Sequence, residues 1–97
     1  MATIEQCEQE IMPLVNTFDW YGKIVPLDGI GEDNYAVQVE VEGENDTFYP
    51  LLDVYQDAAS LKIFTWWYGG VEHICWTNQE VKRTYRKIKQ GWFRHGN

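Results

Sequence analysis

The feature that most constrains the fold is a segment of strict alternation between apolar and polar residues, residues 35–42. Successive side chains of a β-strand point to opposite faces of a sheet, so the segment predicts a strand with one buried face and one face in water. Its apolar side holds Tyr35, Val37, Val39 and Val41, and its polar side holds Gln38, Glu40 and Glu42. The rest of the chain must therefore supply pairing strands and an apolar layer over the buried face.

Two segments that flank this strand also have strand character. Residues 18–26 are rich in aromatic and branched side chains and end at a proline. Within them, Gly22 either weakens the strand or marks a bulge. Residues 47–55 form the return strand, after a turn predicted by composition at residues 43–46. Pro50 in the return strand indicates an edge position or a bulge, because proline cannot donate to the ladder.

A second hairpin follows at residues 61–76. Residues 61–68 form a strand that is dense in aromatic side chains, and residues 71–76 form its returning partner. Gly69-Gly70 between them fits a two-residue type I′ turn, since both central positions of that turn need a positive φ.

A helix is expected before the first strand. Thr3 with Gln6 has the pattern of a capping box that opens this helix. Pro13 lacks an N–H group and crowds the preceding turn, so the helix either kinks there or ends near Met12. The apolar stripe that would face the core is Ile4, Cys7, Ile11, Leu14 and Val15.

A second helix is expected after the last strand. Thr77 with Glu80 is another capping-box pattern, and the helix is predicted to run to about Gln90, with Gly91 after its end. Its apolar stripe is Val81, Tyr85, Ile88 and Trp92.

These elements predict an α+β fold in the order αβββββα. We expect an antiparallel β-sheet of four or five strands, flanked by an N-terminal and a C-terminal helix that pack on one face. Ninety-seven residues make one domain, residues 1–97.

The charges of the chain are divided into two blocks. Residues 1–81 hold all fifteen carboxylates and only two lysines, a net charge of −13, whereas residues 82–97 hold six basic residues and no acid. Residues 28–57 alone hold nine carboxylates and no Lys or Arg. This pattern argues against non-specific binding of DNA or membranes by the whole surface, and it favours electrostatically steered association with a basic protein partner.

The acidic hairpin is the first candidate site. Carboxylates on one face of a strand lie about 7 Å apart, whereas a DNA strand presents a phosphate about every 3.4 Å, so one strand cannot imitate DNA alone. A mimic would combine strand and loop carboxylates: Glu32, Asp33, Glu40, Glu42, Glu44 and Asp46. The alternative is a solvated face whose acids discourage aggregation.

A small, acidic, aromatic-rich α+β chain with the charge pattern of residues 28–57 resembles the phage-encoded anti-CRISPR inhibitors, several of which mimic nucleic acid. The resemblance implies a non-enzymatic inhibitor in the host cytoplasm that binds a basic, nucleic-acid-binding surface of a complex or nuclease. It implies no direct contact with nucleic acid, and a monomer or small homo-oligomer. The chain is also similar to bacterial immunity proteins, which would imply a basic nuclease toxin as partner.

Aromatic side chains give the second candidate site. Adjacent strand residues point to opposite faces, so Trp66 and Trp67 cannot both enter the same side of a sheet. Either both faces are covered, or one tryptophan is exposed and available to a partner. We expect Trp66 and Tyr49 to be the aromatic residues that contact the partner.

The basic end of the chain is the third candidate. Lys82, Arg86 and Lys89 would share one side of the last helix, and basic residues among aromatic ones can bind nucleic acid. The alternatives are a small nucleic-acid-binding module that uses residues 82–97, or an ordinary solvated helix face.

Other chemistry has little support in the sequence. Cys7 and Cys75 stand in no metal-ligand spacing, and free, partly buried thiols are expected. His73 and Cys75 would share a strand face, but no further ligands follow at a recognisable spacing. We therefore expect no catalytic residues, no metal and no cofactor. The acidic N-terminal residues predict no signal peptide, and no apolar run approaches a membrane span.

Overall fold

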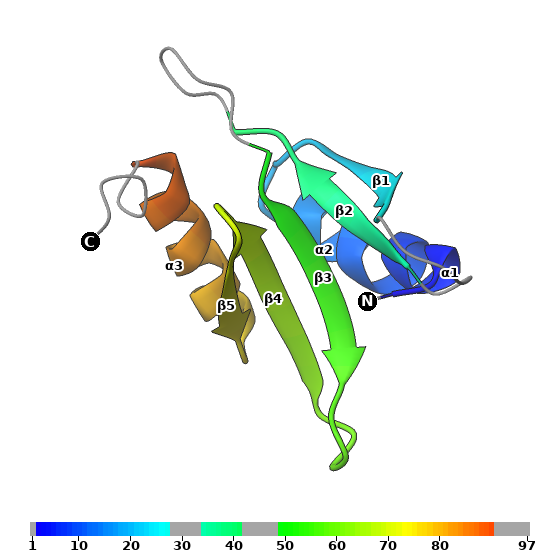
Figure 1. Ribbon diagram of the computed structural model, residues 1–97. Coiled ribbons are helices and arrows are strands. Elements are labelled where there is room, and N and C mark those ends of the chain that lie inside the picture. The colour runs from blue at the N-terminus through cyan, green and yellow to red at the C-terminus, as the bar shows by residue number, and fades with distance from the viewer. Residues whose placement is uncertain (1, 28–33, 42–48, 91–97) are drawn as a thin grey trace.

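The chain forms an antiparallel meander, in which each strand pairs with the next one along the sequence. The computed structural model describes residues 2–27, 34–41 and 49–90, and Figure 1 shows their arrangement. The five described strands are β1 (Gly22–Pro26), β2 (Tyr35–Val39), β3 (Leu51–Gln56), β4 (Lys62–Tyr68) and β5 (Val71–Cys75). The described helical elements are α1 (Ile4–Gln6), the π-helical turn η1 (Cys7–Ile11), α2 (Met12–Thr17) and α3 (Asn78–Lys89). The predicted α+β class and the order αβββββα are confirmed.

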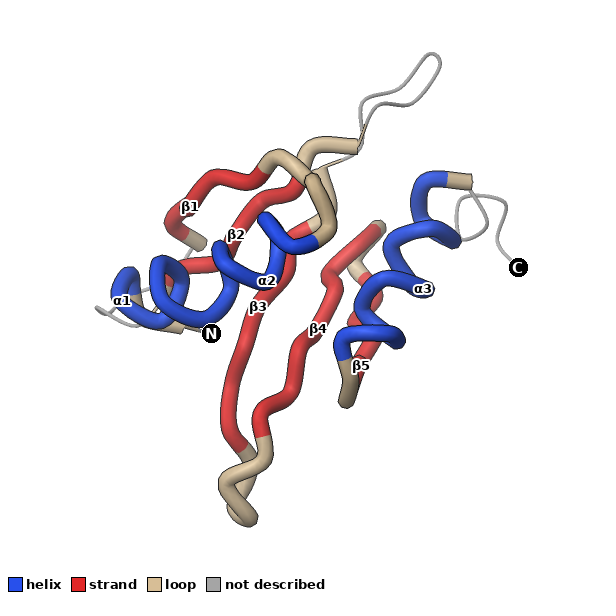
Figure 2. Tube along the Cα trace, turned by 180° about the vertical axis from the view of Figure 1, so that it is seen from behind, coloured by secondary structure: helices blue, strands red, loops and turns tan. Residues whose placement is uncertain are grey.

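The helical elements lie on one face of the sheet, as predicted. Figure 2 shows α1, α2 and α3 in front of the strands, whereas Figure 1 shows the sheet from its other side. α2 contacts β1, η1 contacts β2 and β3, and α3 contacts β4 and β5. The opposite face has no helix over it within the described parts of the chain.

The core fills the space between the helices and the sheet. The register pairs Val37 with Leu52 and Leu52 with Trp66, and none of these three side chains is exposed. The predicted burial of the apolar side of β2 is therefore confirmed. Ile4 is the exception in the N-terminal stripe, because its side chain is exposed. The helices contribute Cys7, Ile11, Leu14, Val15, Val81, Tyr85 and Ile88 to the core.

The N-terminal helix begins as predicted and continues past Pro13, so of the two alternatives the end near Met12 is wrong. Oγ1 of Thr3 accepts from N of Gln6 at 2.9 Å, and Oε1 of Gln6 accepts from N of Thr3 at 3.0 Å, which confirms the capping box. The helix does not end near Met12, because a π-helical turn comes first and α2 continues to Thr17. Pro13 lies in the first turn of α2, where a missing N–H group costs least.

The first strand is shorter than the predicted strand at residues 18–26. Asp19, just beyond the end of α2, adopts a left-handed φ of 57°, so the chain turns before β1 begins at Gly22. Phe18 and Trp20 pack against the core instead, with ring centroids 4.7 Å apart. No bulge occurs in the β1–β2 pair, whose register is continuous over all five pairs.

Gly22 allows α2 to approach β1 closely. A Cβ atom at this position would lie 2.8 Å from Cγ1 of Val37 and 3.2 Å from Cγ1 of Val15, both in buried side chains. We expect Gly22→Ala to lower the free energy of unfolding by about 1–3 kcal/mol, because the core must shift to admit the methyl group. Urea denaturation of the variant beside the wild type measures this effect. An unchanged unfolding midpoint would contradict the explanation that α2 and β1 lie too close together at Gly22 to admit a side chain.

β3 is a central strand, so of the two alternatives given by Pro50, an edge position or a bulge, the edge position is wrong. β3 pairs with β2 on one side and with β4 on the other. Pro50 is compatible with this position because it precedes β3 and contributes its carbonyl, which accepts from N of Val39 at 3.0 Å. The turn predicted at residues 43–46 lies outside the described residues.

The second hairpin and α3 follow the sequence prediction closely. Gly69 and Gly70 have φ values of 62° and 78°, as a type I′ turn requires. Oγ1 of Thr77 accepts from N of Glu80 at 3.1 Å and caps α3. The carboxylate of Glu80 accepts from N of Trp76, also at 3.1 Å, rather than from N of Thr77. Only half of the predicted capping box therefore forms.

Three aromatic rings join α3 to the sheet. Trp20 stacks on Tyr85 with ring centroids 3.8 Å apart, and Trp66 lies 5.6 Å from Trp20. Nε1 of Trp66 donates to O of Val81 at 3.0 Å, which satisfies the only polar group of this buried side chain. The helix, the central sheet and the segment before β1 thus meet at one residue of β4.

Candidate functional site

The face of the sheet opposite the helices carries the candidate site. Because side chains alternate along each strand, one row of residues crosses all five described strands on this side. In register order the row is Lys23, Gln38, Leu51, Trp67 and Glu72. We call this surface the open face, and its other members are Tyr21, Glu40, Tyr49, Tyr55 and Ile74.

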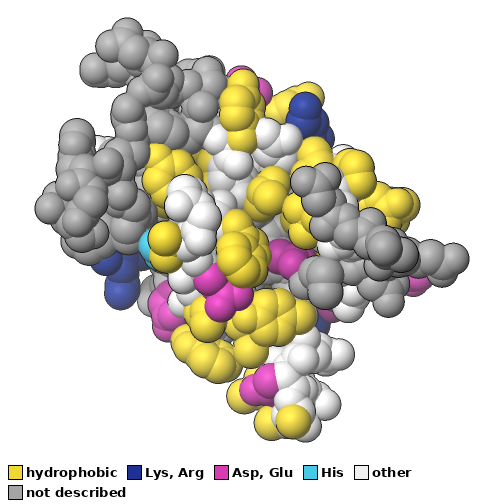
Figure 3. All heavy atoms as spheres, in the orientation of Figure 1, with side chains coloured by type: hydrophobic (Ala, Val, Ile, Leu, Met, Phe, Trp, Pro, Cys, Tyr) yellow, Lys and Arg dark blue, Asp and Glu magenta, His cyan; other side chains and the backbone are white. Residues whose placement is uncertain are grey.

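The open face presents large apolar side chains to water. The exposed fractions are 39% for Trp67, 46% for Ile74 and 52% for Tyr49. Leu51 is half-buried beside Trp67, so apolar surface continues from β4 to β3. Figure 3 shows this side of the molecule, where hydrophobic side chains gather over the strands with acidic ones among them. Contiguous apolar surface of this kind marks contact sites on folded domains.

Two polar residues on this side of the sheet are buried, and they oppose each other across β3 and β4. Oγ1 of Thr65 donates to Oη of Tyr55 at 3.2 Å, which orients a ring of the open face. Oδ1 of Asp53 accepts from N of Val54 at 2.8 Å. Burial raises the pKa of Asp53 above its ordinary value, and this hydrogen bond offsets only part of the rise. The folded state therefore holds this proton more strongly than the unfolded chain does.

Asp53 is expected to make the stability of the fold depend on pH. Because its pKa is raised from 3.8, folding gains from protonation below that value and loses this gain as the pH rises through the folded pKa. The free energy of unfolding of Asp53→Asn should therefore increase relative to that of the wild type as the pH rises above 3.8. Denaturant unfolding of both proteins over a pH series measures the difference. A difference that falls with rising pH would contradict the raised pKa.

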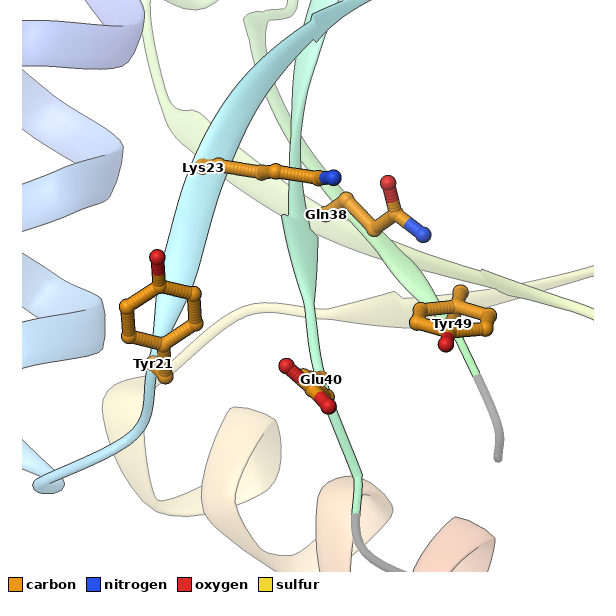
Figure 4. Close-up of a pocket in the computed structure, with 5 residues that line it drawn as sticks. All are labelled: Tyr21, Lys23, Gln38, Glu40 and Tyr49. Atoms are coloured by element: carbon orange, nitrogen blue, oxygen red, sulfur yellow. The ribbon is translucent and has the colours of Figure 1, made fainter. Parts of the chain in front are cut away.

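A notch lies at the β1–β2 end of the open face. It has a volume of about 210 Å³, and we call it the tyrosine notch; it is lined by Tyr21, Lys23, Gln38, Glu40 and Tyr49. Two backbone hydrogen bonds position it: N of Glu40 donates to O of Tyr21 at 3.1 Å, and N of Val39 donates to O of Pro50 at 3.0 Å. Figure 4 shows the carboxylate of Glu40 between the two tyrosine side chains.

The structure brings together two of the predicted site residues. Glu40 and Tyr49 are both exposed, and both line the tyrosine notch. The other predicted acids lie outside the described residues: Glu32, Asp33, Glu42, Glu44 and Asp46. Sequence reasoning missed Tyr21, which is 70% exposed, because it was assigned to the interior of a strand.

The assignment of Trp66 as an exposed contact residue is wrong. Its side chain has no exposed surface, because α3 and Trp20 cover the helix side of β4. Trp67 points to the open face instead and is the partly exposed member of the pair. The alternation that separates these two residues was visible in the sequence, but the side to which each points was not, because both faces of β4 carry apolar residues.

A second, basic surface lies along α3, on the helix layer. A hollow of about 310 Å³ there is lined by Gln79, Lys82, Arg83 and Arg86. Gln79 and Arg86 each lie three or four residues from both Lys82 and Arg83, so the four side chains share one side of the helix. Nζ of Lys82 lies 5.9 Å from the ring centroid of Phe18. Trp92 and the other residues after Gln90 lie outside the described residues.

The cysteines and His73 lie on the core side rather than on the open face. Both thiols are free and buried, as expected, and burial raises the pKa of Cys7 to about 11. Burial also raises the pKa of Cys75 and lowers that of His73, which disfavours the thiolate and the imidazolium. Among the residues that the structure describes, no three His, Cys, Asp or Glu side chains are placed to hold a metal ion.

No described helix of this chain combines the length and the apolar character needed to cross a membrane. Comparisons with protein-family models, with curated proteins and with solved structures find no match for this chain.

Proposed function

We propose that this chain is a non-enzymatic binding protein whose open face docks on a basic, nucleic-acid-binding surface of a partner protein and blocks it. The observation that carries the proposal is the open face itself, which exposes Trp67 and Ile74 with no described helix above them. A partly exposed tryptophan on a sheet face, beside other apolar side chains, is a typical hot spot of protein interfaces.

Charge is the reason to expect a basic partner. Residues 1–81 carry a net charge of −13, and the described charged side chains of the open face are Glu40, Glu72 and Lys23. A partner surface rich in Arg and Lys would complement this charge and associate rapidly at low salt. Surfaces that bind nucleic acid have this composition. Inhibition by anti-CRISPR proteins in the cytoplasm of an infected cell fits these requirements, and so does neutralisation of a basic nuclease toxin by an immunity protein.

Affinity capture from nuclease-treated host lysate tests the proposal. The baits are the wild type and an open-face variant, Trp67→Thr with Ile74→Thr, since threonine retains strand propensity. Capture is compared at about 0.1 M and about 1 M salt, between which the Debye length falls from about 10 Å to about 3 Å.

The proposal predicts a basic protein that binds the wild type but not the variant, is lost at high salt, and is displaced by added duplex nucleic acid. Equal capture by both baits would contradict a role for the open face. Capture that added nucleic acid does not affect would contradict occupation of a nucleic-acid-binding surface.

A second candidate function rests on the hollow of α3. Lys82, Arg83 and Arg86 line it together, so a phosphate backbone could contact three cations at once. In this alternative the chain is a small nucleic-acid-binding module. Recovery of nucleic acid from lysate that has not been treated with nuclease, with loss on K82Q/R86Q, would favour it over the open face.

A further inference from the structure

We propose that the tyrosine notch binds the guanidinium group of an arginine side chain on the partner surface. This inference rests on the proposed function and makes it more specific, because it names the chemical group that the open face recognises. The notch combines two exposed phenol rings with one exposed carboxylate, those of Tyr21, Tyr49 and Glu40.

The backbone fixes this combination of groups. Tyr21 and Glu40 are held side by side by the bond from N of Glu40 to O of Tyr21. Tyr49 is brought to the other side of Glu40, because the residue that follows it pairs with Val39. Figure 4 shows the result, with the carboxylate of Glu40 between the two tyrosine side chains. The site therefore exists before any partner binds.

An arginine side chain matches these groups better than a lysine side chain does. The guanidinium group is planar, so it can lie against a tyrosine ring while it donates two parallel hydrogen bonds to a carboxylate. An ammonium group can pair with the charge of the carboxylate, but it cannot donate two parallel hydrogen bonds to it or lie flat against a tyrosine ring. No ion pair joins Glu40 to another described residue, so its carboxylate is available to a cation from outside.

Lys23 sets the direction from which the cation enters. Its side chain lines the same notch and lies beside Gln38, its cross-strand neighbour. A second cation is repelled from that wall and attracted to the wall formed by Glu40. Removing the charge with Lys23→Gln should therefore tighten binding of arginine, whereas an acidic ligand would bind less well to the same variant.

NMR titration of the whole chain with the peptide acetyl-Gly-Arg-Gly-amide tests the inference. We expect the largest amide shifts at Tyr21, Glu40 and Tyr49. Glu40→Gln should weaken binding by about fivefold or more, and Tyr49→Ala by a similar factor. Tyr49→Phe should retain binding because it keeps the ring. Glu72→Gln is the matched control, because Glu72 is an exposed carboxylate of the same face outside the notch.

The same peptide with citrulline in place of arginine controls for charge, since citrulline has a similar shape and no cation. The inference predicts that the citrulline peptide leaves the amide resonances of the notch residues unshifted. Equal shifts with citrulline, or equal arginine binding by the wild type and Glu40→Gln, would overturn it.

The outcomes separate this inference from the proposed function. In one outcome, the arginine peptide does not bind the notch, but the variant Trp67→Thr with Ile74→Thr no longer captures a basic protein. The notch inference then fails and the proposed function stands. If the peptide binds the notch while the open-face variant captures the same protein as the wild type, the proposed function fails and the arginine site stands.

Discussion

Trp66→Ala is expected to lower the free energy of unfolding by about 3–5 kcal/mol, because it removes the largest fully buried side chain of the described residues. The side chain is fully buried and contacts the rings of Trp20 and Tyr85. Its removal leaves a cavity between β4 and α3, and it also removes the indole N–H that donates to the carbonyl of Val81. Because a domain of this size is stable by only about 5–15 kcal/mol, the variant should be at the limit of folding.

Two control variants separate the contribution of the hydrogen bond from that of the buried ring. Trp66→Phe keeps an aromatic ring but loses the hydrogen bond to O of Val81, so its cost should be about 1–3 kcal/mol. Trp76→Ala changes a tryptophan that is 53% exposed, and its effect should stay near 0.5 kcal/mol. Denaturant unfolding measures all three variants. A loss for Trp66→Ala that does not exceed the loss for Trp76→Ala would contradict the central position of Trp66 in the core.

Trp67→Thr is expected to have the largest effect on partner binding. A partly exposed tryptophan at the centre of an interface contributes about 2 kcal/mol or more when truncated, which corresponds to roughly a 30-fold rise in Kd. The side chain lies next to Leu51 and Glu72 on the open face, so its loss removes a large apolar side chain from the proposed contact. Titration calorimetry with the captured partner measures the change, and circular dichroism checks that the variant is folded.

The strand β5 offers a matched pair of controls for this prediction. Ile74 and Val71 are 46% and 53% exposed, but they lie on opposite sides of the sheet. Ile74→Ala should weaken binding, whereas Val71→Ala should leave the Kd nearly unchanged. Equal effects at the two positions would show that the partner does not distinguish the open face from the helix side.

The sequence predicted those elements whose signal is local. The alternation of residues 35–42, the Gly69-Gly70 turn and the apolar stripe of α3 each depend on a spacing that only one structure satisfies. For Gly69-Gly70, no other residue pair adopts two positive φ values as readily. These signals were sufficient for the order of elements and the antiparallel sheet.

The errors arose where tertiary contacts decide between local alternatives. Pro13 permitted a helix that kinks or a helix that ends near Met12, and the chain instead continues through a π-helical turn into α2. A proline is tolerated both in an edge strand and directly before the first residue of a central strand. The presence of Pro50 therefore does not distinguish these two positions.

The candidate site was predicted only in part, for a related physical reason. β4 has apolar residues on both sides, so alternation separated Trp66 from Trp67 without showing which one the helices cover. The tyrosine notch could not be predicted, because it depends on the pairing of Tyr21 with Glu40 across two segments of the chain. A residue's own neighbours in sequence carry no information about such a pair.

Hydroxyl-radical footprinting of the chain, free and bound to the captured partner, tests directly whether the open face is the binding surface. We predict that binding lowers the oxidation rates of Trp67, Tyr49 and Tyr21, which are accessible on the open face of the free chain. Val71, on the helix side of β5, and Ile4, in α1, are exposed away from the open face and should keep their rates. Unchanged oxidation of Trp67 and Tyr49 in a saturated complex would contradict the claim that the open face is where this protein binds.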